Sequence, residues 1–245
     1  MNALIEALSE KIPVNKVYIA DGKRDKRVDH VIRLCKENGV VFQMVPQQTI
    51  SRKAGSDHQG IFAEISPIRF YELDEIINSI QTGLILILDS INDTGNLGAI
   101  IRSAVAANVD AVVISQRNSA PINETVLKTS SGALLKARIV ISKNLSRDFE
   151  FLKQNNFWIV GSVMNAERSI PYYDFDFTVN TAIVMGNENK GVSPLLQKNS
   201  DQAIYIPQSK RIDSLNVSAA SAVLLFEALR QKSVKNKSVT NKIQS

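Results

Sequence analysis

The sequence predicts an α/β protein whose main part is a parallel sheet with helices on both faces. Residues 84–88 are apolar at every position, as expected of a strand that is buried on both faces. Further strand-like runs stand at 111–115, 137–141, 157–161, 182–185 and 203–206. Helical patterns lie between them, at 97–107, 124–130, 145–155 and 217–231. Strands that alternate with helices indicate right-handed crossovers and one sheet covered on both sides.

A smaller α/β section precedes this sheet. Strand patterns alternate there with helical patterns, the strands at 16–20, 40–45 and 60–65 and the helices at 2–9 and 28–38. Pro67 and the charged stretch 69–75 follow, and a connecting helix is expected at 72–80. We therefore expect a first domain at 1–67, a linker at 68–83 and a second domain at 84–231.

The end of the chain is basic. Its charged residues are all positive and leave 24 basic and 24 acidic residues in the rest of the chain; they are Arg230, Lys232, Lys235, Lys237 and Lys242. This composition predicts a disordered tail at 232–245. Such a tail can contact a polyanion, and a solvated tail without a partner fits the composition equally well.

The cysteine and histidine content limits the possible sites. Cys35 is the one cysteine, which excludes an intramolecular disulfide and favours a reducing compartment. His30, His58 and one thiol are too few for a zinc site, so no metal is expected. The sequence has no signal-peptide pattern and no apolar run of about 20 residues, which predicts a cytoplasmic protein without a membrane partner.

Polar residues follow the first strand of the predicted sheet. They begin at Asn96 and end at Arg102, with Gly98 between them. Thr94 or Asn96 can cap the helix that starts here, and Asn108 can end it. Gly98 allows the close approach of a ligand or of another backbone. The alternative is that Asn96 is only a cap and Arg102 only a solvent-exposed helix residue.

A glycine-rich turn with a carboxylate follows the strand at 182–185. Gly186 and Gly191 flank Glu188 in this turn. Backbone groups of such a turn can bind a small molecule, with Glu188 held inside a crevice; an ordinary turn with a surface glutamate is the alternative. The glycine spacing of a dinucleotide site, G-x-G-x-x-G, is absent.

A third polar segment, Ser-Leu-Asn-Val-Ser at 214–218, opens the last predicted helix. Ser214 or Asn216 as a plain helix cap is the alternative interpretation. The three segments all follow predicted parallel strands, whose carboxyl ends share one edge of the sheet. We therefore expect the segments to meet in the crevice where α/β proteins bind ligands.

Together these segments resemble the SpoU (TrmH) family of RNA ribose 2′-O-methyltransferases, within the SPOUT class. N-x-G-x-x-x-R at 96–102, G-x-E-x-x-G at 186–191 and S-L-N-V-S at 214–218 stand in the family's order. The segment 120–133 is similar to the family's central part. The first section resembles the ribosomal-protein-like RNA-binding domain of the bacterial 23S ribosomal RNA guanosine members, and His58-Gln59-Gly60 matches a piece of it.

The resemblance implies a C-terminal trefoil knot, a homodimer formed through the last helix and S-adenosylmethionine as the methyl donor. It implies that the donor pocket is lined by Gly186, Ile206 and Leu215. It also implies a polar site formed by Asn96, Arg102, Glu188 and Asn216. Asn189 and Lys210 stand where glycine is frequent in the family, but neither is a polar site residue, so we expect an active enzyme.

The family's base is often taken to be the arginine, here Arg102. A guanidinium rarely releases its proton, so binding of the adjacent phosphate by Arg102 is chemically easier. Glu188 can act as the base or orient Arg102. Asn96 and Asn216 offer amide donors and acceptors to the ribose and to neighbouring loops.

The expected substrate is a guanosine of 23S ribosomal RNA, because a separate first domain is present. A transfer RNA ribose methyltransferase is one alternative, and a non-catalytic RNA-binding module with the same fold is another. The four intact polar residues argue against the module. A generic nucleotide-binding protein is disfavoured because the sequence has no phosphate-loop motif.

Overall fold

The chain forms two compact units, Met1–Ile68 and Arg69–Ser245, which we describe separately. The computed structural model describes residues 1–9, 14–22, 25–55, 58–65, 68–80, 82–164, 167–188, 190–209, 211 and 214–243. The positions Asn189 and Lys210, where the sequence departs from the family pattern, lie outside these ranges.

The first unit is a three-stranded sheet with helices. Its elements are α1 (Asn2–Ser9), β1 (Val14–Ala20), α2 (Lys26–Glu37), β2 (Val41–Val45), α3 (Gln47–Ala54) and β3 (Ile61–Ile65). The strand order is β2-β1-β3, in which β1 pairs parallel with β2 and antiparallel with β3. The predicted strands and helices are present with shifted ends. Helix α3 was not predicted, because its eight residues hold a single buried apolar side chain, Ile50.

The two faces of this sheet are packed differently. Val17 and Ile19 of β1 are fully buried on one face. On the other face Ile50 of α3 packs with Ala20 and Val45 at one end of the strands. Side chains alternate along a strand, so the β1 residue between Val17 and Ile19 points to the α3 side. The sheet is only partly covered on that side.

The second unit contains the predicted parallel sheet. Its elements are α4 (Leu73–Ile77), β4 (Leu84–Leu88), α5 (Thr94–Ala106), β5 (Ala111–Ser115), α6 (Glu124–Thr129), η1 (Ala133–Leu135), β6 (Ile139–Ser142), α7 (Leu145–Gln154), β7 (Trp158–Ser162), β8 (Ser169–Pro171), η2 (Tyr172–Asp174), β9 (Thr181–Met185), α8 (Pro194–Asn199), β10 (Gln202–Tyr205) and α9 (Val217–Ile243). In the described residues the strand order is β6-β5-β4-β9-β7-β10-β8, and every pair is parallel.

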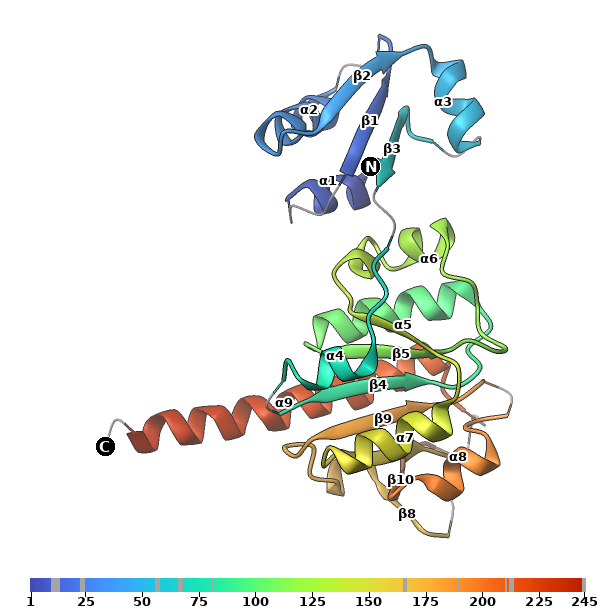
Figure 1. Ribbon diagram of the computed structural model, residues 1–245, viewed down its shortest axis with the longest axis vertical. Coiled ribbons are helices and arrows are strands. Elements are labelled where there is room, and N and C mark those ends of the chain that lie inside the picture. Colours follow the sequence, from blue (N-terminus) through green and yellow to red (C-terminus); the bar gives the residue numbers. More distant parts are fainter. Residues whose placement is uncertain are drawn as a thin grey trace. The chain divides into compact units, whose positions relative to one another are not determined.

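Helices cover both faces of this sheet, as predicted (Figure 1). Ile85 and Ile87 of β4 belong to a core with Phe149 of α7 and Leu196 of α8. The alternate β4 residues point to the opposite face, where α5 buries a row of apolar side chains and α9 packs against α5. All five residues of β4 are buried, which is why this strand is apolar at each position.

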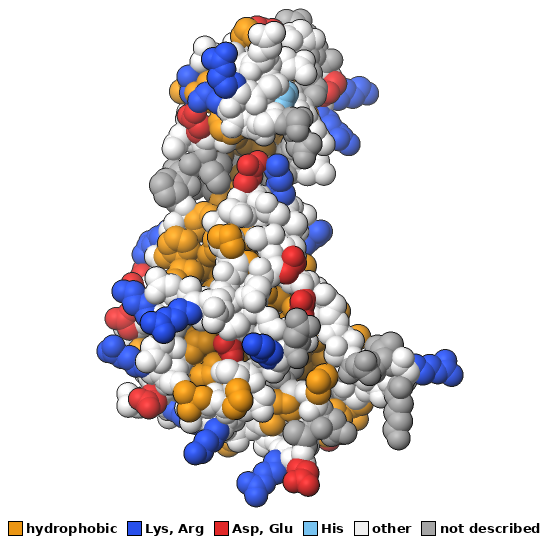
Figure 2. All heavy atoms as spheres, turned by 90° about the vertical axis from the view of Figure 1, so that its right-hand side faces the viewer, with side chains coloured by type: hydrophobic (Ala, Val, Ile, Leu, Met, Phe, Trp, Pro, Cys, Tyr) orange, Lys and Arg blue, Asp and Glu red, His pale blue; other side chains and the backbone are white. Residues whose placement is uncertain are grey.

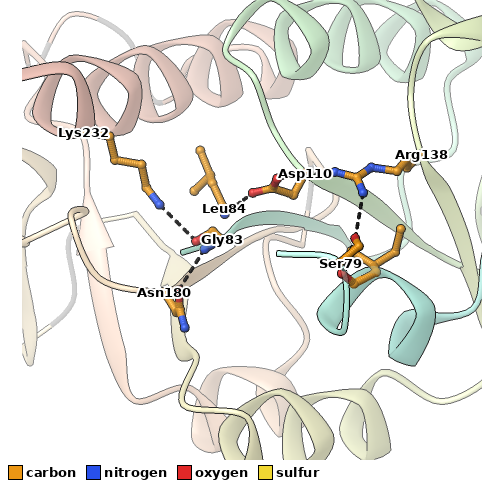
Figure 3. A network of polar contacts seen from close by, with 8 residues as sticks. Ser79, Gly83, Leu84, Asp110, Arg138, Asn180 and Lys232 are labelled. Carbon is orange, nitrogen blue, oxygen red and sulfur yellow. Dashed lines mark hydrogen bonds and ion pairs between the residues drawn. The ribbon is translucent and has the colours of Figure 1, made fainter. Parts of the chain in front are cut away.

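Polar groups close the amino ends of the central strands (Figure 3). The Gly83 N–H donates to Asn180 Oδ1 at 2.8 Å, and the Leu84 N–H donates to Asp110 Oδ2 at 2.8 Å. Lys232 Nζ of α9 donates to the Gly83 carbonyl at 3.1 Å. Burial lowers the pKa of Lys232. These side chains satisfy backbone groups at the start of β4.

The prediction of a disordered tail from residue 232 is wrong up to Ile243, because α9 continues to that residue. The segment contains no glycine or proline that would end a helix. Its first part is also held to the sheet unit, since Lys232 contacts Gly83 and Lys235 Nζ donates to Thr178 Oγ1 at 3.2 Å. The prediction of disorder rested on a composition rich in lysine and serine, which does not show such contacts with distant residues.

The described residues contain neither a membrane-spanning helix nor a metal-binding cluster. None of the helices there combines the length and the apolar character needed to cross a bilayer. Among the same residues, no group of three or more His, Cys, Asp or Glu side chains could hold a metal ion.

Candidate functional site

The three predicted polar segments lie at the carboxyl ends of strands in the second unit. Asn96 is in the first turn of α5, which follows β4. Glu188 follows β9, and Asn216 comes directly before α9. Because β4 and β9 are neighbouring parallel strands, the loops that follow them leave the same edge of the sheet.

Hydrogen bonds join three of the four predicted polar residues. Asn216 Nδ2 donates to Asn96 Oδ1 at 3.0 Å, and Asn96 Nδ2 donates to Glu188 Oε1. These partners are 120 and 92 positions apart in the chain. The structure therefore brings Asn96, Glu188 and Asn216 into one network, which we call the amide–carboxylate chain.

The start of α9 sets the direction of this chain. Asn216 Oδ1 accepts from the Ser218 N–H at 2.9 Å, so its amide oxygen faces the helix and its Nδ2 faces Asn96. Asn96 Oδ1 is then an acceptor, which leaves its Nδ2 to donate to Glu188. Donors thus run in sequence from the helix backbone to the Glu188 carboxylate, which is exposed to solvent.

The helix that carries Asn96 is not capped by either predicted residue. Asp93 is the N-cap of α5, and its Oδ1 accepts from the Asn96 N–H at 2.7 Å. The expectation of a Thr94 or Asn96 cap was therefore wrong. With Asp93 as the cap, the Asn96 side chain is available for Glu188 and Asn216. Asn108 ends the helix as expected, with a left-handed φ of 56°.

Arg102 lies apart from the amide–carboxylate chain in the part of the molecule that the structure describes. Its Nη1 donates to Ser131 Oγ at 3.1 Å, and its side chain is exposed. It shares a helix face with Gly98, four residues earlier, and Asn96 lies on another face. Ser131 has a φ of 53°, in the turn after α6. Arg102 therefore faces the turn 130–132.

The close approach at Gly98 is made by this same part of the protein. A Cβ on Gly98 would overlap the Thr129 side chain and lie 3.0 Å from the Ser130 nitrogen. The close neighbours of Gly98 are therefore the Thr129 side chain and the Ser130 backbone.

The turn that carries Glu188 is tightly packed. A Cβ on Gly186 would overlap the backbone of Gly191 and Val192. The Gly191 N–H donates to the Asn187 carbonyl at 2.7 Å, and Gly191 has a φ of 66°. Glycine is therefore required at 186 by close packing and favoured at 191 by its left-handed conformation.

Asp89 anchors this turn and was missed by the sequence analysis. It is buried at the end of β4, and its Oδ2 accepts from the Ser193 N–H at 2.9 Å. Next to it, the Ser90 carbonyl accepts from Asn187 Nδ2 at 3.0 Å. A carboxylate directly after a fully apolar strand was the available signal. Asp89 therefore holds the turn that carries Glu188.

The residues expected in the donor pocket lie at the same edge of the sheet. Gly186 directly follows β9 and is buried. Ile206 directly follows β10, and Leu215 lies two residues before the start of α9. Both side chains are half-buried. This edge therefore combines apolar side chains, loop backbone and the amide–carboxylate chain.

Comparisons with known proteins agree with this arrangement. Residues 83–226 match the model of the SpoU rRNA Methylase family, and residues 1–71 match the family model described as RNA 2'-O ribose methyltransferase substrate binding. The chain is 38% identical over 235 residues to the 23S rRNA (guanosine-2'-O-)-methyltransferase RlmB of Escherichia coli K12, covering 94% of this chain and 96% of that protein. It is 33% identical to a putative TrmH family tRNA/rRNA methyltransferase of Staphylococcus saprophyticus, covering 94% of each.

Solved structures show the same fold. The SpoU methyltransferase AviRb of Streptomyces viridochromogenes, in complex with AdoMet, aligns with a TM-score of 0.78 at 21% identity and covers 95% of this chain and 88% of that one. An AdoMet-bound rRNA methyltransferase of Sinorhizobium meliloti aligns with a TM-score of 0.74 at 23% identity, over 94% and 85%. The sequence motifs, the parallel sheet and these matches lead to one conclusion: this chain belongs to the SpoU rRNA methylase family.

Proposed function

We propose that this protein transfers a methyl group from S-adenosylmethionine to a ribose 2′-hydroxyl in structured RNA, and that its substrate is a guanosine of 23S ribosomal RNA. The observation that carries the proposal is the amide–carboxylate chain, which assembles motif residues from three distant segments at one edge of the sheet. The RlmB relative, 38% identical over nearly the whole chain, supports the choice of ribosomal RNA.

Gly186, Ile206 and Leu215 hold the methyl donor in this proposal. An adenine ring packs on apolar side chains and exchanges hydrogen bonds with backbone groups. Half-buried Ile206 and Leu215 provide apolar contact, and the loops after β9 and β10 provide backbone groups, so the residues fit this ligand. Bound there, S-adenosylmethionine supplies a methyl group that its sulfonium already activates.

The protein's own residues must position the ribose hydroxyl and take its proton. Glu188 is the base in this proposal, because its carboxylate is the end point of the amide–carboxylate chain. Asn96 fixes one oxygen of that carboxylate, and Asn216 fixes Asn96. Orientation of this kind contributes up to about 7–11 kcal/mol to lowering a barrier in the best intramolecular cases.

Arg102 binds the phosphate next to the reacting ribose. Its guanidinium is exposed and has one donor engaged by the neutral Ser131 hydroxyl, which places no negative charge against it. A phosphate is a stronger acceptor than a hydroxyl and can be bound by two guanidinium donors at once. Arg102 therefore orients the RNA and does not serve as the base.

The remaining features of the family are part of the same proposal. We infer a trefoil knot in the C-terminal part of the sheet domain, RNA binding by the first domain, and a location in the cytoplasm. We also infer a homodimer formed through α9, on which Phe226 is 48% exposed. Figure 2 shows that hydrophobic side chains are exposed on the surface of the second unit, among Lys and Arg side chains.

The test combines donor binding with methyl transfer. Calorimetry with S-adenosylmethionine should show binding, and labelled methyl groups should enter 23S ribosomal RNA at a guanosine ribose, mapped by resistance to alkaline cleavage. Methylation of transfer RNA in place of ribosomal RNA would contradict the proposed substrate and favour a transfer RNA ribose methyltransferase. Absence of donor binding by the folded protein would overturn the proposal.

A further inference from the structure

Two aromatic rings and two lysines meet on the partly covered face of the sheet in the first unit. Tyr18 of β1 and Phe62 of β3 are direct cross-strand partners, and their ring centroids lie 5.9 Å apart. Lys16 Nζ and Lys53 Nζ each lie 4.9 Å from the Tyr18 ring centroid. We call Lys16, Tyr18, Lys53 and Phe62 the aromatic–lysine face.

The packing of the unit leaves this face accessible. Helix α3 covers the far end of the strands through Ile50 and brings Lys53 over Tyr18 and Phe62. Tyr18 and Phe62 are half-buried, and the Lys53 side chain is 40% exposed. In the space-filling view, Lys and Arg side chains stand at the margins of the first unit (Figure 2).

The face carries two lysines and one carboxylate, Glu64 of β3, which is the cross-strand partner of Lys16. Lys53 Nζ donates to Glu64 Oε1 at 2.9 Å, and this hydrogen bond raises the pKa of Lys53 and lowers the pKa of Glu64. Both groups are therefore charged at neutral pH, and Lys16 adds a second positive charge beside Tyr18. The Lys53–Glu64 pair is exposed, so water and salt screen it and a phosphate can compete for Lys53.

We propose that the aromatic–lysine face stacks an unpaired base of the RNA substrate while Lys16 and Lys53 bind the flanking phosphates. This inference rests on the proposed function and names the part of the first domain that recognises RNA. A base stacked on an aromatic ring contributes more than an exposed contact between a lysine and that ring. When a base replaces the lysines on the Tyr18 ring, the lysines bind phosphates of the RNA and counterions are released. Both changes favour binding of the RNA.

An unpaired base is the occupant that this chemistry selects. Bases of a double helix are already stacked on one another, and sequence-specific RNA recognition mostly uses bases of loops, bulges and ends. The face should therefore distinguish a hairpin loop from a duplex of equal length.

The test measures binding of the full-length protein to two fluorescent RNAs, a hairpin with an unpaired loop and a fully paired duplex of equal length. Tyr18→Leu and Phe62→Leu should each weaken hairpin binding by about 5- to 100-fold and leave duplex binding nearly unchanged. Tyr18→Phe, which keeps the ring, should bind the hairpin like the wild type. Lys53→Gln should reduce the slope of log affinity against log salt concentration by about one.

The chain offers matched controls in the same unit. Phe42 pairs with Val17 and therefore lies on the opposite face of the sheet, so Phe42→Leu should not change hairpin binding. Lys36→Gln on α2 removes an exposed charge away from the face. Thermal unfolding of each variant checks that it is folded.

Folded Tyr18→Leu and Phe62→Leu variants that bind the hairpin like the wild type would overturn this inference. The proposed function would then still stand, because donor binding and methyl transfer are measured separately on the wild type. If the wild type neither binds the donor nor methylates RNA, the proposed function fails instead.

Discussion

The two ends of the seven-stranded sheet both carry polar networks, but the networks differ in what they bind. At the carboxyl end Asn216, Asn96 and Glu188 bind one another through their side chains. At the amino end Asp110, Asn180 and Lys232 bind backbone groups of Gly83 and Leu84 (Figure 3). At the carboxyl end the bonds between distant segments join side chains to one another, whereas at the amino end the bonds to Gly83 and Leu84 join side chains to the main chain.

This difference agrees with the function proposed for the carboxyl-end network. Buried backbone N–H and C=O groups need partners in any folded protein, so the amino-end network is explained by folding alone. At the carboxyl end Glu188 and Asn216 are exposed and water could satisfy them instead, so folding alone does not explain their bonds to Asn96. A cavity alone does not identify the functional end of the sheet. A cavity of 430 Å³ lies at the amino end, lined in part by Leu84, Asp110 and Lys232.

The largest expected effect comes from Glu188→Gln at the carboxyl end of the sheet. Loss of the base should lower kcat about 100- to 1,000-fold, while the melting temperature stays nearly unchanged because Glu188 is exposed. Single-turnover methylation of ribosomal RNA measures the rate. Glu150→Gln, on an exposed position of α7, is the matched control and should have wild-type activity. A near-normal rate in Glu188→Gln would remove Glu188 from the site.

Asp110→Ala tests the structural end. It leaves the Leu84 N–H without its acceptor and should lower the free energy of unfolding by about 1–3 kcal/mol. Methyl transfer per folded molecule should not change, which urea unfolding and activity assays measure together. Asp110→Asn keeps an oxygen for the Leu84 N–H and should lose less stability. A large loss of kcat with little loss of stability would reverse the roles assigned to the two ends.

Asp93→Ala separates the helix backbone from the side chain of Asn96, because Asp93 caps the helix that presents Asn96. Loss of the cap should lower the free energy of unfolding by about 1 kcal/mol. The rate of methyl transfer should fall less than in Glu188→Gln, since the Asn96 side chain remains. Asp93→Ser, which retains a cap, should restore most of the stability. A stability equal to that of the wild type in Asp93→Ala would contradict the cap.

The smallest effect is expected at Asp148, on the face of the sheet away from α5. Burial raises the pKa of Asp148, although a hydrogen bond from Ser142 opposes the shift. The folded state therefore favours the protonated carboxyl, and the stability that this provides is lost as pH rises through the raised pKa. Asp148→Asn removes this pH dependence and should change stability at pH 7 by no more than about 0.5 kcal/mol.

Urea unfolding between pH 3 and pH 7, with Glu150→Gln as the control in the same helix, tests the sign. The wild type should lose stability relative to Asp148→Asn as pH rises across this range. The opposite trend would show that the hydrogen bond from Ser142 outweighs burial.

Much of the fold could be predicted from local patterns. Runs such as 84–88 are apolar without interruption because both faces of a central parallel strand are buried, and this pattern is visible without a structure. Helix α3 could not be predicted from the sequence, because it is short and has little apolar surface to mark a buried face. The last part of α9 could not be predicted either, because the residues that it contacts, Gly83 and Thr178, are distant in the sequence.

The motifs that contain Asn96, Arg102, Glu188 and Asn216 can be read directly from the amino-acid sequence. Which of these residues bind one another depends on the folded structure. It joined Asn96 to Glu188 and Asn216, turned Arg102 toward Ser131 and made Asp93 the cap. The physical reason is that hydrogen-bond partners 92 and 120 positions apart are selected by the packing of strands and helices between them, which no local pattern records.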